Sequence, residues 1–443
     1  MFAYQIKGNN QRMNKIFENK ISTVIEPKKL GLVERRLRLN SNLTIEQAAK
    51  YLGISRGNLS EIENGKRGLK EEAFLKFINH FYPDFNFDWL LVEEAEKKLD
   101  ELAFAFIYCN FAREDEIEKW VEKNRVSLLN SFACLYLTVF ETYFYYRKSI
   151  DRDEEDQLNG SDGFIQYFSP DVKAFLLFNK GYMYMDTEKS NEAIELFEMA
   201  LREMDCKKWP QLEGVIKLNL ACVVAQDLSF QRALDLVSEA VALFIKDANF
   251  FRVVIAYNNQ ANYLCLIGQY EKAIYIVDKV ILNKNTFQDQ RAYTMAVSNK
   301  ILIEMLWGHF TKALQFVQNH KFEFNPKHPD NFVLEPYCLL RLGCHRECIK
   351  SIKSYQNYTL GEEDEAFYAL IKAVISKKED RIDKTRVKML SVCHRTKNWG
   401  MALMTFHVLI YYYKQTGQSD RLVEVYEWQA GLHNHQMPDI CEL

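Results

Sequence analysis

The chain has 443 residues, a formal net charge of −3 and 48% hydrophobic residues. This length is too great for one hydrophobic core and predicts at least two domains. Only 8 prolines and 17 glycines, with 14% aromatic residues, favour long helices with short loops and exclude a largely disordered chain. The most apolar stretches, such as Met401 to Tyr413, are too short to span a bilayer. We therefore expect an all-α protein with no membrane-embedded part.

The ends of the chain differ in charge. Residues 1–80 hold 15 Lys and Arg against 8 Asp and Glu, about +7, and the remainder holds 42 against 52, about −10. A basic N-terminal region favours contact with phosphate, while an acidic body limits non-specific binding to DNA. The ten cysteines are irregularly spaced and no secretory signal precedes the first domain, which predicts reduced thiols and a cytoplasmic location. Residues 1–28 form a polar leader to which we assign no function.

Residues 44–67 contain the signals of two short helices joined by a tight turn. Thr44 begins the first helix as an N-cap, and Gln47 completes a capping box. Gly53 ends this helix, because glycine readily adopts a positive φ, and Ser55 caps the second helix. Ile54, together with Leu59 and Ile62 of the second helix, is expected to point inward. This arrangement is that of a helix-turn-helix reader of double-stranded DNA.

The second helix is expected to enter the major groove with its N-terminal end. Arg56 is the best candidate for reading a base, because its guanidinium can bond both O6 and N7 of guanine, while Asn58 pairs with adenine or caps its own helix. The basic loop that follows is expected to contact phosphate, which fixes register but carries little sequence information. The predicted DNA-binding residues are Thr44, Ser55, Arg56, Gly57, Asn58, Ser60, Glu61, Lys66 and Arg67, with Asn64 and Gly65 in the loop.

Residues 30–82 resemble the helix-turn-helix domain of phage repressors and of the xenobiotic-response-element (XRE) family. The resemblance is carried by Leu43, Thr44, Ala49, Leu52, Gly53, Ser55, Ser60, Ile62, Glu63, Asn64, Gly65 and Lys66. Two positions depart from the family pattern: Ile45 replaces a frequent glutamine and Gly57 replaces a frequent polar reader. The alternative is a helix pair used only for protein contact.

The second part of the chain is repetitive. An alanine recurs every 40 residues at positions 193, 233, 273 and 313, and a larger apolar residue follows each one four positions later. Such a period indicates a helical solenoid, in which the small residue lets two antiparallel helices approach and the large one fills the groove. The pattern resembles a tetratricopeptide repeat, with turns at Gly268 and Gly308, weaker units near Gly343 and Gly417, and an irregular opening pair at 99–150.

An asparagine stands fourteen residues before each of these alanines: Asn179, Asn219, Asn259 and Asn299. In solenoids of this type the first helix of each pair lines the concave surface, where carboxamides suit the N–H and C=O groups of an extended peptide. The neighbouring positions expected to form side-chain pockets for a hydrophobic peptide are Phe178, Tyr182, Leu218, Cys222, Asn258, Asn262, Met295, Ser298 and Leu302. The alternative is a structural column that bonds adjacent helices.

The order of the two modules resembles that of the peptide-pheromone regulators of Gram-positive bacteria, the group that includes Rgg, PlcR, NprR and PrgX. The resemblance implies a homodimer on a palindromic operator, with a short imported peptide bound in the repeats that repositions or releases the DNA-binding domains. The column of four asparagines would grip the peptide backbone. A partner protein in place of the peptide is the alternative.

The predicted division is a leader at 1–28, the helix-turn-helix domain at 29–82, a linker helix at 83–98 that transmits the change, and the repeat domain at 99–443. The aromatic-rich end from Phe406 to Trp428 is either a dimer surface or the cap of the solenoid. We find none of the GxGxxG, phosphate-loop, HExxH or GxSxG motifs and predict no enzyme and no cofactor. Cys338, Cys344, His345, Cys348, Cys393 and His394 are the candidates for a metal site, but Cys348 occupies a small-residue position of the repeat and favours packing.

Overall fold

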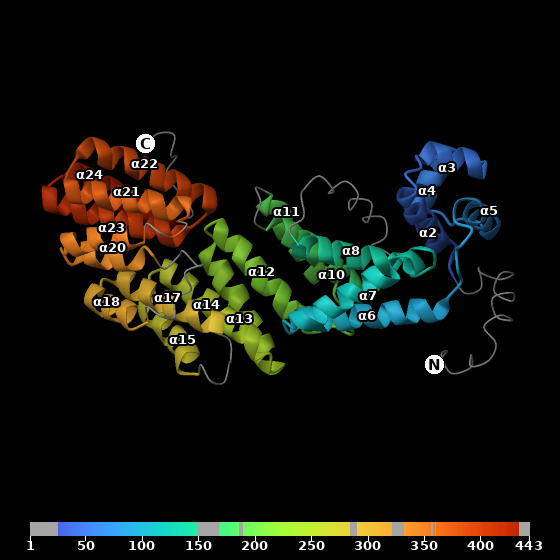
Figure 1. Cartoon of the computed structure of the whole chain (residues 1–443), viewed down its shortest axis with the longest axis horizontal. Helices are drawn as coiled ribbons and strands as arrows, with labels where there is room; N and C mark the ends of the chain where they lie inside the picture. The colour runs from blue at the N-terminus through green and yellow to red at the C-terminus, as the bar shows by residue number, and fades with distance from the viewer. Residues whose placement is uncertain are drawn as a thin grey trace. The chain divides into compact units, whose positions relative to one another are not determined.

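The computed structural model describes residues 25–148, 168–185, 189–283, 290–320, 332–355, 358 and 360–433. Within these residues the chain is all α-helical, apart from an isolated parallel bridge between Asn86 and Ser131 (Figure 1). The predicted fold class is therefore confirmed. The chain divides into two compact units, residues 1–212 and 213–443.

The helices of the first unit comprise the helix-turn-helix domain and the opening helices of the repeat region. They are α2 (Pro27–Asn40), α3 (Ile45–Leu52), α4 (Arg56–Glu63), α5 (Glu71–Phe81), α6 (Trp89–Ile107), α7 (Phe111–Leu129), α8 (Cys134–Lys148), α10 (Pro170–Tyr184) and α11 (Ser190–Glu203).

The helices of the second unit are antiparallel pairs. They are α12 (Leu212–Gln226) with α13 (Phe230–Lys246), α14 (Phe250–Leu266) with α15 (Tyr270–Leu282), α17 (Gln290–Trp307) with α18 (Phe310–Asn319), α19 (Leu334–Arg341) with α20 (His345–Ser354), α21 (Glu362–Ser376) with α22 (Glu379–Thr396), and α23 (Trp399–Thr416) with α24 (Ser419–His433). The first residue of α12 belongs to the first unit.

The local signals of the helix-turn-helix are confirmed. Thr44 and Gln47 form the capping box at the start of α3, with the Gln47 N–H donating to Thr44 Oγ1 at 3.2 Å. Gly53 ends α3 with φ of 72°, a left-handed conformation that favours glycine. The Ser55 hydroxyl caps α4 by accepting from the Asn58 N–H at 3.2 Å. These caps fix the angle between the two helices within a few residues of sequence.

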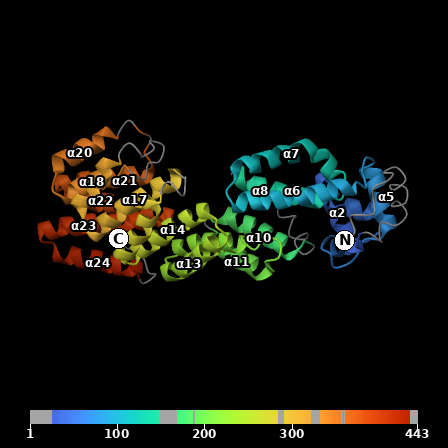
Figure 2. The same ribbon diagram turned by 90° about the horizontal axis from the view of Figure 1, so that it is seen from below.

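The hydrophobic core of the helix-turn-helix domain extends beyond the domain itself. Phe132, in the turn between α7 and α8, stacks on Phe74 of α5 and on Trp89 at the start of α6, with ring centroids 5.9 and 5.3 Å apart. Arg36 of α2 forms an ion pair with Glu141 of α8. Helices α6, α7 and α8 lie side by side (Figure 2). The domain is therefore packed on this three-helix layer within one compact unit.

The predicted domain boundaries differ from the observed elements. The boundary between the linker helix at 83–98 and the repeat domain at 99 falls inside α6, which runs unbroken through 19 residues. The expected opening pair at 99–150 is instead three helices, α6 to α8. At the N-terminal side, α2 begins at Pro27, and most of the predicted leader lies outside the described residues.

The 40-residue repeat is present as helix pairs. The four alanines at the repeat positions lie in α11, α13, α15 and α18 and are fully buried, and Phe197, Val237, Val277 and Val317 beside them are exposed by at most 2%. Within the pairs, Gly268 and Gly308 adopt φ of +76° and +98° in the predicted turns. Burial of the alanines lets each second helix approach its neighbour closely.

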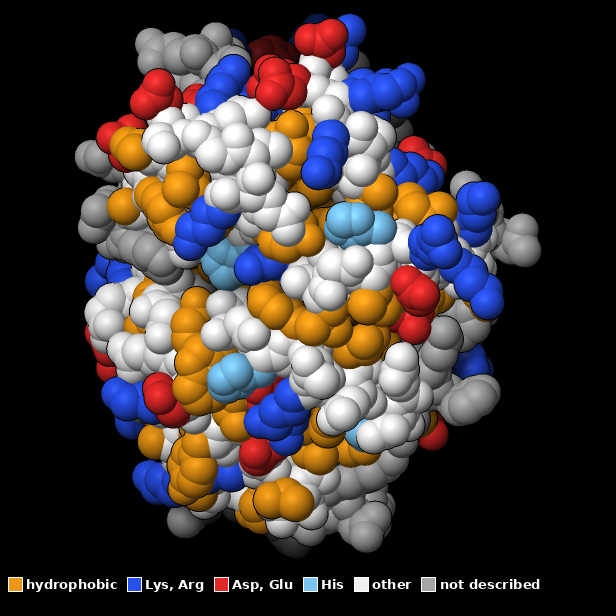
Figure 3. Space-filling model, turned by 90° about the vertical axis from the view of Figure 1, so that its left-hand side faces the viewer, with side chains coloured by type: hydrophobic (Ala, Val, Ile, Leu, Met, Phe, Trp, Pro, Cys, Tyr) orange, Lys and Arg blue, Asp and Glu red, His pale blue; other side chains and the backbone are white. Residues whose placement is uncertain are grey.

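The aromatic residues near the C-terminus are mainly internal. Phe406 is fully buried and Trp428 is 5% exposed, and their rings pack 6.2 Å apart between α23 and α24. Val423 and Tyr426 of α24 are more than 40% exposed. Figure 3 shows the face over this end of the second unit, where hydrophobic side chains form strips separated by Lys and Arg. Phe406 and Trp428 thus pack inside this helix pair, while part of α24 stays exposed.

Candidate DNA-binding and ligand sites

The exposed face of α4 begins with Arg56, whose side chain is 72% exposed. Its Nε lies 2.9 Å from Oε1 of Glu46 on α3, so the guanidinium is held across the outer surface of the helix pair. Gly57 follows in the first turn, and a Cβ added there would meet no atom within 4 Å. The start of α4 thus presents a cationic group and an unobstructed helix surface.

Thr44 and Ser55 are the N-caps of α3 and α4, and the other predicted DNA-binding residues lie on α4 or in the loop after it. Arg67 Nε is 2.7 Å from Glu61 Oε2, so this arginine folds back onto α4, and Lys66 beside it is exposed. Ser60 is half-buried, and its hydroxyl lies 3.5 Å from Asn64 Nδ2. The structure therefore brings Arg56, Lys66 and Arg67 to the same helix and its following loop as exposed cations.

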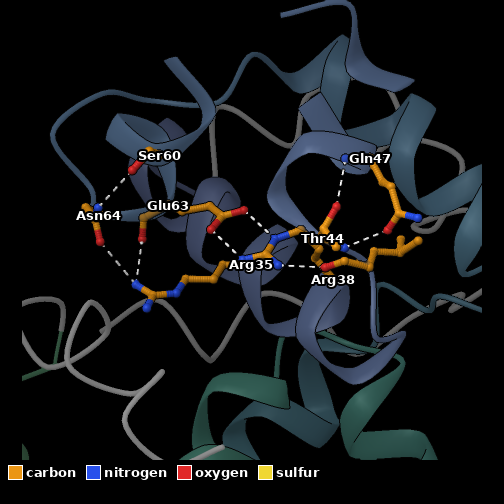
Figure 4. A network of polar contacts seen from close by, with 8 residues as sticks. Arg35, Arg38, Thr44, Gln47, Ser60, Glu63 and Asn64 are labelled. Carbon is orange, nitrogen blue, oxygen red and sulfur yellow. Dashed lines mark hydrogen bonds and ion pairs between the residues drawn. The ribbon is translucent and has the colours of Figure 1, made fainter. Parts of the chain in front are cut away.

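A buried network of charged side chains connects α4 to α2. Arg38 of α2 donates from Nε and Nη2 to the two carboxylate oxygens of Glu63, at 2.6 and 2.7 Å, and from Nη1 to the Leu43 carbonyl at 2.7 Å (Figure 4). Arg35 donates to the Glu63 carbonyl at 3.3 Å. Together with the bond to Leu43, this bidentate buried pair links α2, the loop before α3 and the end of α4. It fixes the recognition helix relative to α2.

Our sequence interpretation did not single out this network. The available signal was position: Glu34 and Arg38 follow Leu30 at intervals of four residues, so they share the buried side of α2. Charged residues on such a side require buried partners. The nearby Gly31 also has a packing role, because a Cβ there would lie 2.6 Å from the Ile62 side chain.

Glu34 is buried beside the Arg38–Glu63 pair. Burial and the neighbouring Glu63 carboxylate raise the pKa of Glu34 to about 8, against the opposing effect of Arg38. Glu34 is therefore largely protonated below that pH in the folded protein. This neutral form keeps the interior of the helix-turn-helix domain from holding two adjacent negative charges.

The second unit contains a cavity of about 270 Å³ among its first helices. Its wall comes from three successive first helices and from the turn between α22 and α23. The wall residues include Cys222 and Gln226 of α12, Asn259 and Asn262 of α14, Leu302 of α17, and Lys397, Asn398, Trp399 and Gly400 at the turn. Four residues predicted to bind peptide, namely Cys222, Asn259, Asn262 and Leu302, thus lie around one cavity.

The asparagine column is not uniform. The Nδ2 groups of Asn179 and Asn219 donate to the carbonyls of Phe175 and Val215, each one turn back on the same helix, and Asn179 is only 4% exposed. Asn299 donates to Asn258 Oδ1 at 3.0 Å, and Asn258 is fully buried. Asn259 alone of the column lines the cavity, where its Nδ2 lies 3.2 Å from Cys222 Sγ.

The remaining predicted peptide contacts are dispersed. Phe178 is 1% exposed and Tyr182 42% exposed, both on α10 of the first unit, while Met295 on α17 is 47% exposed. Leu218 is 3% exposed, and Ser298 bonds the Thr294 carbonyl of its own helix. These residues do not line the cavity of the second unit.

Two contacts between distant turns close one side of the cavity. Lys397 Nζ lies 2.8 Å from Asp227 Oδ1, and Trp399 Nε1 donates to the Gln226 carbonyl at 3.0 Å. The partners are 170 and 173 residues apart in sequence. The α22–α23 turn is therefore joined to the turn after α12, and sequence periodicity carried no signal of this.

The candidate metal residues are placed separately. Cys348 Sγ donates to the Pro336 carbonyl at 3.2 Å inside a helix pair, and Cys344 precedes α20 as its N-cap. In the described part of the chain no group of three His, Cys, Asp or Glu side chains is arranged to hold a metal. Nor does any described helix have the length and apolar character required to cross a membrane.

Comparison with known proteins identifies the class. Residues 35–81 match the helix-turn-helix family model. The HTH-type transcriptional repressor RghR of Bacillus subtilis (strain 168) is 33% identical over 108 residues, which cover 21% of this chain and 79% of that protein. The chain belongs to this family of helix-turn-helix transcriptional regulators and is a DNA-binding regulator.

Two solved structures share the fold over most of the chain. A Rap protein complexed with competence and sporulation factor is 14% identical, with a TM-score of 0.56, and covers 79% of this chain and 99% of its own. NprR in complex with its cognate peptide NprX is 16% identical, with a TM-score of 0.50, and covers 76% of this chain and 88% of its own. The predicted resemblance to regulators with helical repeats is confirmed at the level of fold.

Proposed function

We propose that this regulator is controlled by a short peptide that binds in the cavity of the second unit and changes DNA binding. The observation that carries the proposal is the convergence of Asn259, Asn262 and Leu302 with Trp399 around that cavity. Carboxamides beside apolar side chains suit a peptide, because the amides bond its backbone and the apolar wall receives a side chain.

The cavity amides are available for a ligand at little cost. Asn259 Nδ2 donates to a thiol sulfur, a weak acceptor, so a peptide carbonyl replaces that bond with a stronger one. Asn262 lies one turn further along α14 and is half-buried on the same wall. We assign the backbone contacts to these two residues rather than to Asn179 and Asn219, which donate to their own helices.

The solved relatives support the ligand class. The NprR structure contains its cognate peptide, and the Rap structure contains competence and sporulation factor. A cavity of about 270 Å³ suits part of a short ligand better than the surface of a folded protein. This favours a peptide over a partner protein.

At the DNA-binding end, we assign base contact to Arg56 and phosphate contact to Lys66 and Arg67. Arg56 lies in the first turn of α4, the part of a recognition helix that meets base edges. The exposed cations of the following loop suit the backbone. A homodimer reading a palindromic operator in the cytoplasm completes the proposal, since helix-turn-helix dimers bind paired half-sites about one helical turn apart.

The test is a thermal-shift assay of the full chain with synthetic peptides encoded by the small reading frames beside its gene. A peptide at about one hundred times its dissociation constant adds about 2.7 kcal/mol of stability. Replacing both cavity amides, by Asn259→Ala with Asn262→Ala, should abolish the shift. The matched control Asn283→Ala, at the exposed C-terminal end of α15, should retain it. An equal shift in the cavity variant would contradict the proposed site.

A further inference from the structure

The cavity of the second unit has a single charged group in its wall. Among the described residues that line it, Lys397 is the one cation, and none is Asp or Glu. Lys397 lies at the rim, where its Nζ contacts Asp227 Oδ1 at 2.8 Å, and the two side chains are 30% and 35% exposed. A pair this exposed is worth at most about 1 kcal/mol, so another carboxylate can replace Asp227.

The start of α23 adds positive potential to the same wall. Asn398 caps this helix by accepting from the Met401 N–H at 3.1 Å, and Trp399 and Gly400 follow in the first turn at the cavity. The helix is 18 residues long. Its N-terminus carries a partial positive charge, which favours an anion near Lys397.

Another part of the wall is apolar. Leu266, Leu302 and Leu306, with Ala225, face the same space as the asparagines. A volume of about 270 Å³ lies below the roughly 300–1,000 Å³ of pockets that enclose a whole drug-sized ligand. The cavity therefore has room for one end of a peptide, consisting of one aliphatic side chain and the groups attached to it.

We propose that the cavity selects a peptide by a carboxylate next to an aliphatic side chain, and that this carboxylate takes the place of Asp227 on Lys397. This inference rests on the proposed function and names its ligand class. The free C-terminal end of a peptide ending in Leu, Ile or Val fits this cavity in three ways. Its carboxylate meets Lys397, its aliphatic side chain enters among the leucines, and its last amide meets Asn262. An internal Asp or Glu side chain is the other source of the same chemistry.

The test is affinity selection by the full chain from three synthetic sets of peptides of about five to eight residues. The first set ends in a free carboxylate after Leu, Ile or Val, the second is identical but C-terminally amidated, and the third is amidated with one internal Asp. We expect enrichment of the first set over the second by about five- to twenty-fold, from an ion pair of about 1 kcal/mol and the smaller effect of the α23 N-terminus. Equal enrichment of the third and first sets would transfer the contact to a side-chain carboxylate and overturn the terminal assignment.

Two variants should have opposite effects on the binding of free-acid peptides. Lys397→Met removes the ammonium group, and because Met, like Lys, has an unbranched side chain at this φ of +53°, backbone strain stays similar. It should abolish the preference for free acids. Asp227→Asn removes the competing carboxylate and should tighten binding of the same acids by about two- to five-fold. The exposed Lys350→Met of α20 is the matched control and should leave both values unchanged.

The outcomes separate this inference from the proposed function. Capture of acid and amide peptides alike, unaffected by Lys397→Met, overturns the carboxylate contact and leaves peptide sensing standing. Weaker binding in both the Lys397 and Asp227 variants indicates that their ion pair only holds the turns together, and this also overturns the exchange. Capture of no peptide from any set contradicts the proposed function and the inference with it.

Discussion

At the scale of single residues, Arg56 separates base reading from general attraction to DNA. Its exposed guanidinium at the start of α4 forms an ion pair with Glu46 of α3. The Arg56→Ala variant should bind the operator about ten- to a hundred-fold more weakly than the wild type. It should bind scrambled DNA nearly as well as the wild type does. Fluorescence anisotropy with operator DNA selected from random sequence measures both.

Lys66→Ala is the comparison for that experiment. A phosphate contact carries no sequence information, so this variant should weaken binding to operator and scrambled DNA by the same factor and reduce the salt dependence. If Arg56→Ala also lowered both affinities equally, Arg56 would be a phosphate contact and not a base reader.

The buried Glu34 carboxyl makes the stability of the DNA-binding domain depend on pH. Its pKa is raised from 4.5 to about 8, so between those values the folded state holds a proton that the unfolded state has lost. Stability from this group is therefore present below about pH 4.5 and is lost as the pH rises to about 8. Relative to wild type, Glu34→Gln should be more stable by about 2 to 4 kcal/mol at about pH 8.5, with a smaller difference near pH 5.

Urea unfolding at the two pH values, followed by tryptophan fluorescence to which Trp89 beside the domain's core contributes, measures this difference. A gap between the two proteins that does not change with pH would show that Glu34 titrates normally in the folded state. Glu46→Gln, at an exposed surface carboxylate, controls for the loss of one negative charge.

The roles of residues that contact near neighbours in sequence were predictable. The roles of residues that contact distant parts of the chain were not. Thr44, Gly53 and Ser55 act within three or four positions, so the spacing alone identified them. Whether an asparagine donates to its own helix, as Asn219 does, or faces a cavity, as Asn259 does, depends on packing against the next helix. Lys397 meets Asp227 across 170 residues, and no local pattern marks that contact.

At the scale of elements, two glycines of opposite conformation should respond oppositely to alanine. Gly308, between α17 and α18, has φ of +98°, where a side chain costs about 1 to 2 kcal/mol. Gly57 lies inside α4 with no atom within 4 Å of a Cβ, and alanine there should stabilise the helix by about 0.5 to 1 kcal/mol. Gly308→Ala should lower the thermal unfolding midpoint and Gly57→Ala should raise it. Similar shifts of one sign would contradict these backbone assignments.

The repeat elements were predictable because the same close approach of two helices recurs in each one. A small residue at 193, 233, 273 and 313 is needed wherever a second helix meets its neighbours, so the period survives in the sequence. The opening helices lack that period, and α6 runs through the predicted boundary near 98 even though its residues change there from mostly charged at 93–98 to mostly apolar at 99–107. The predicted boundary therefore falls within a continuous helix of the three-helix layer.

At the scale of the whole molecule, the DNA-binding domain depends on residues well beyond its own sequence. Phe132 lies 50 residues after the last residue of the domain and yet stacks in its core on Phe74. Phe132→Ala should cost about 3 to 5 kcal/mol, as for other large buried aromatics, and weaken DNA binding without a change on the DNA surface.

Hydrogen exchange across the chain locates that effect. Amides of α2 and α5 should lose protection in Phe132→Ala, while those of α14 and α15 in the second unit should keep it. Phe111→Ala, at a side chain 47% exposed on α7, is the matched control and should change neither. Unchanged protection in α2 and α5 would mean that the domain is stable without the layer beneath it.

The coupling between the two ends of the molecule is the central claim. It is tested most directly by the affinity of the full chain for its operator, with and without a saturating free-acid peptide recovered by affinity selection. Wild type should change its operator affinity by at least about five-fold, the lower range of measured allosteric couplings, and the Asn259→Ala, Asn262→Ala variant should show no change. An operator affinity that stays the same in the wild type when peptide is demonstrably bound would contradict the account.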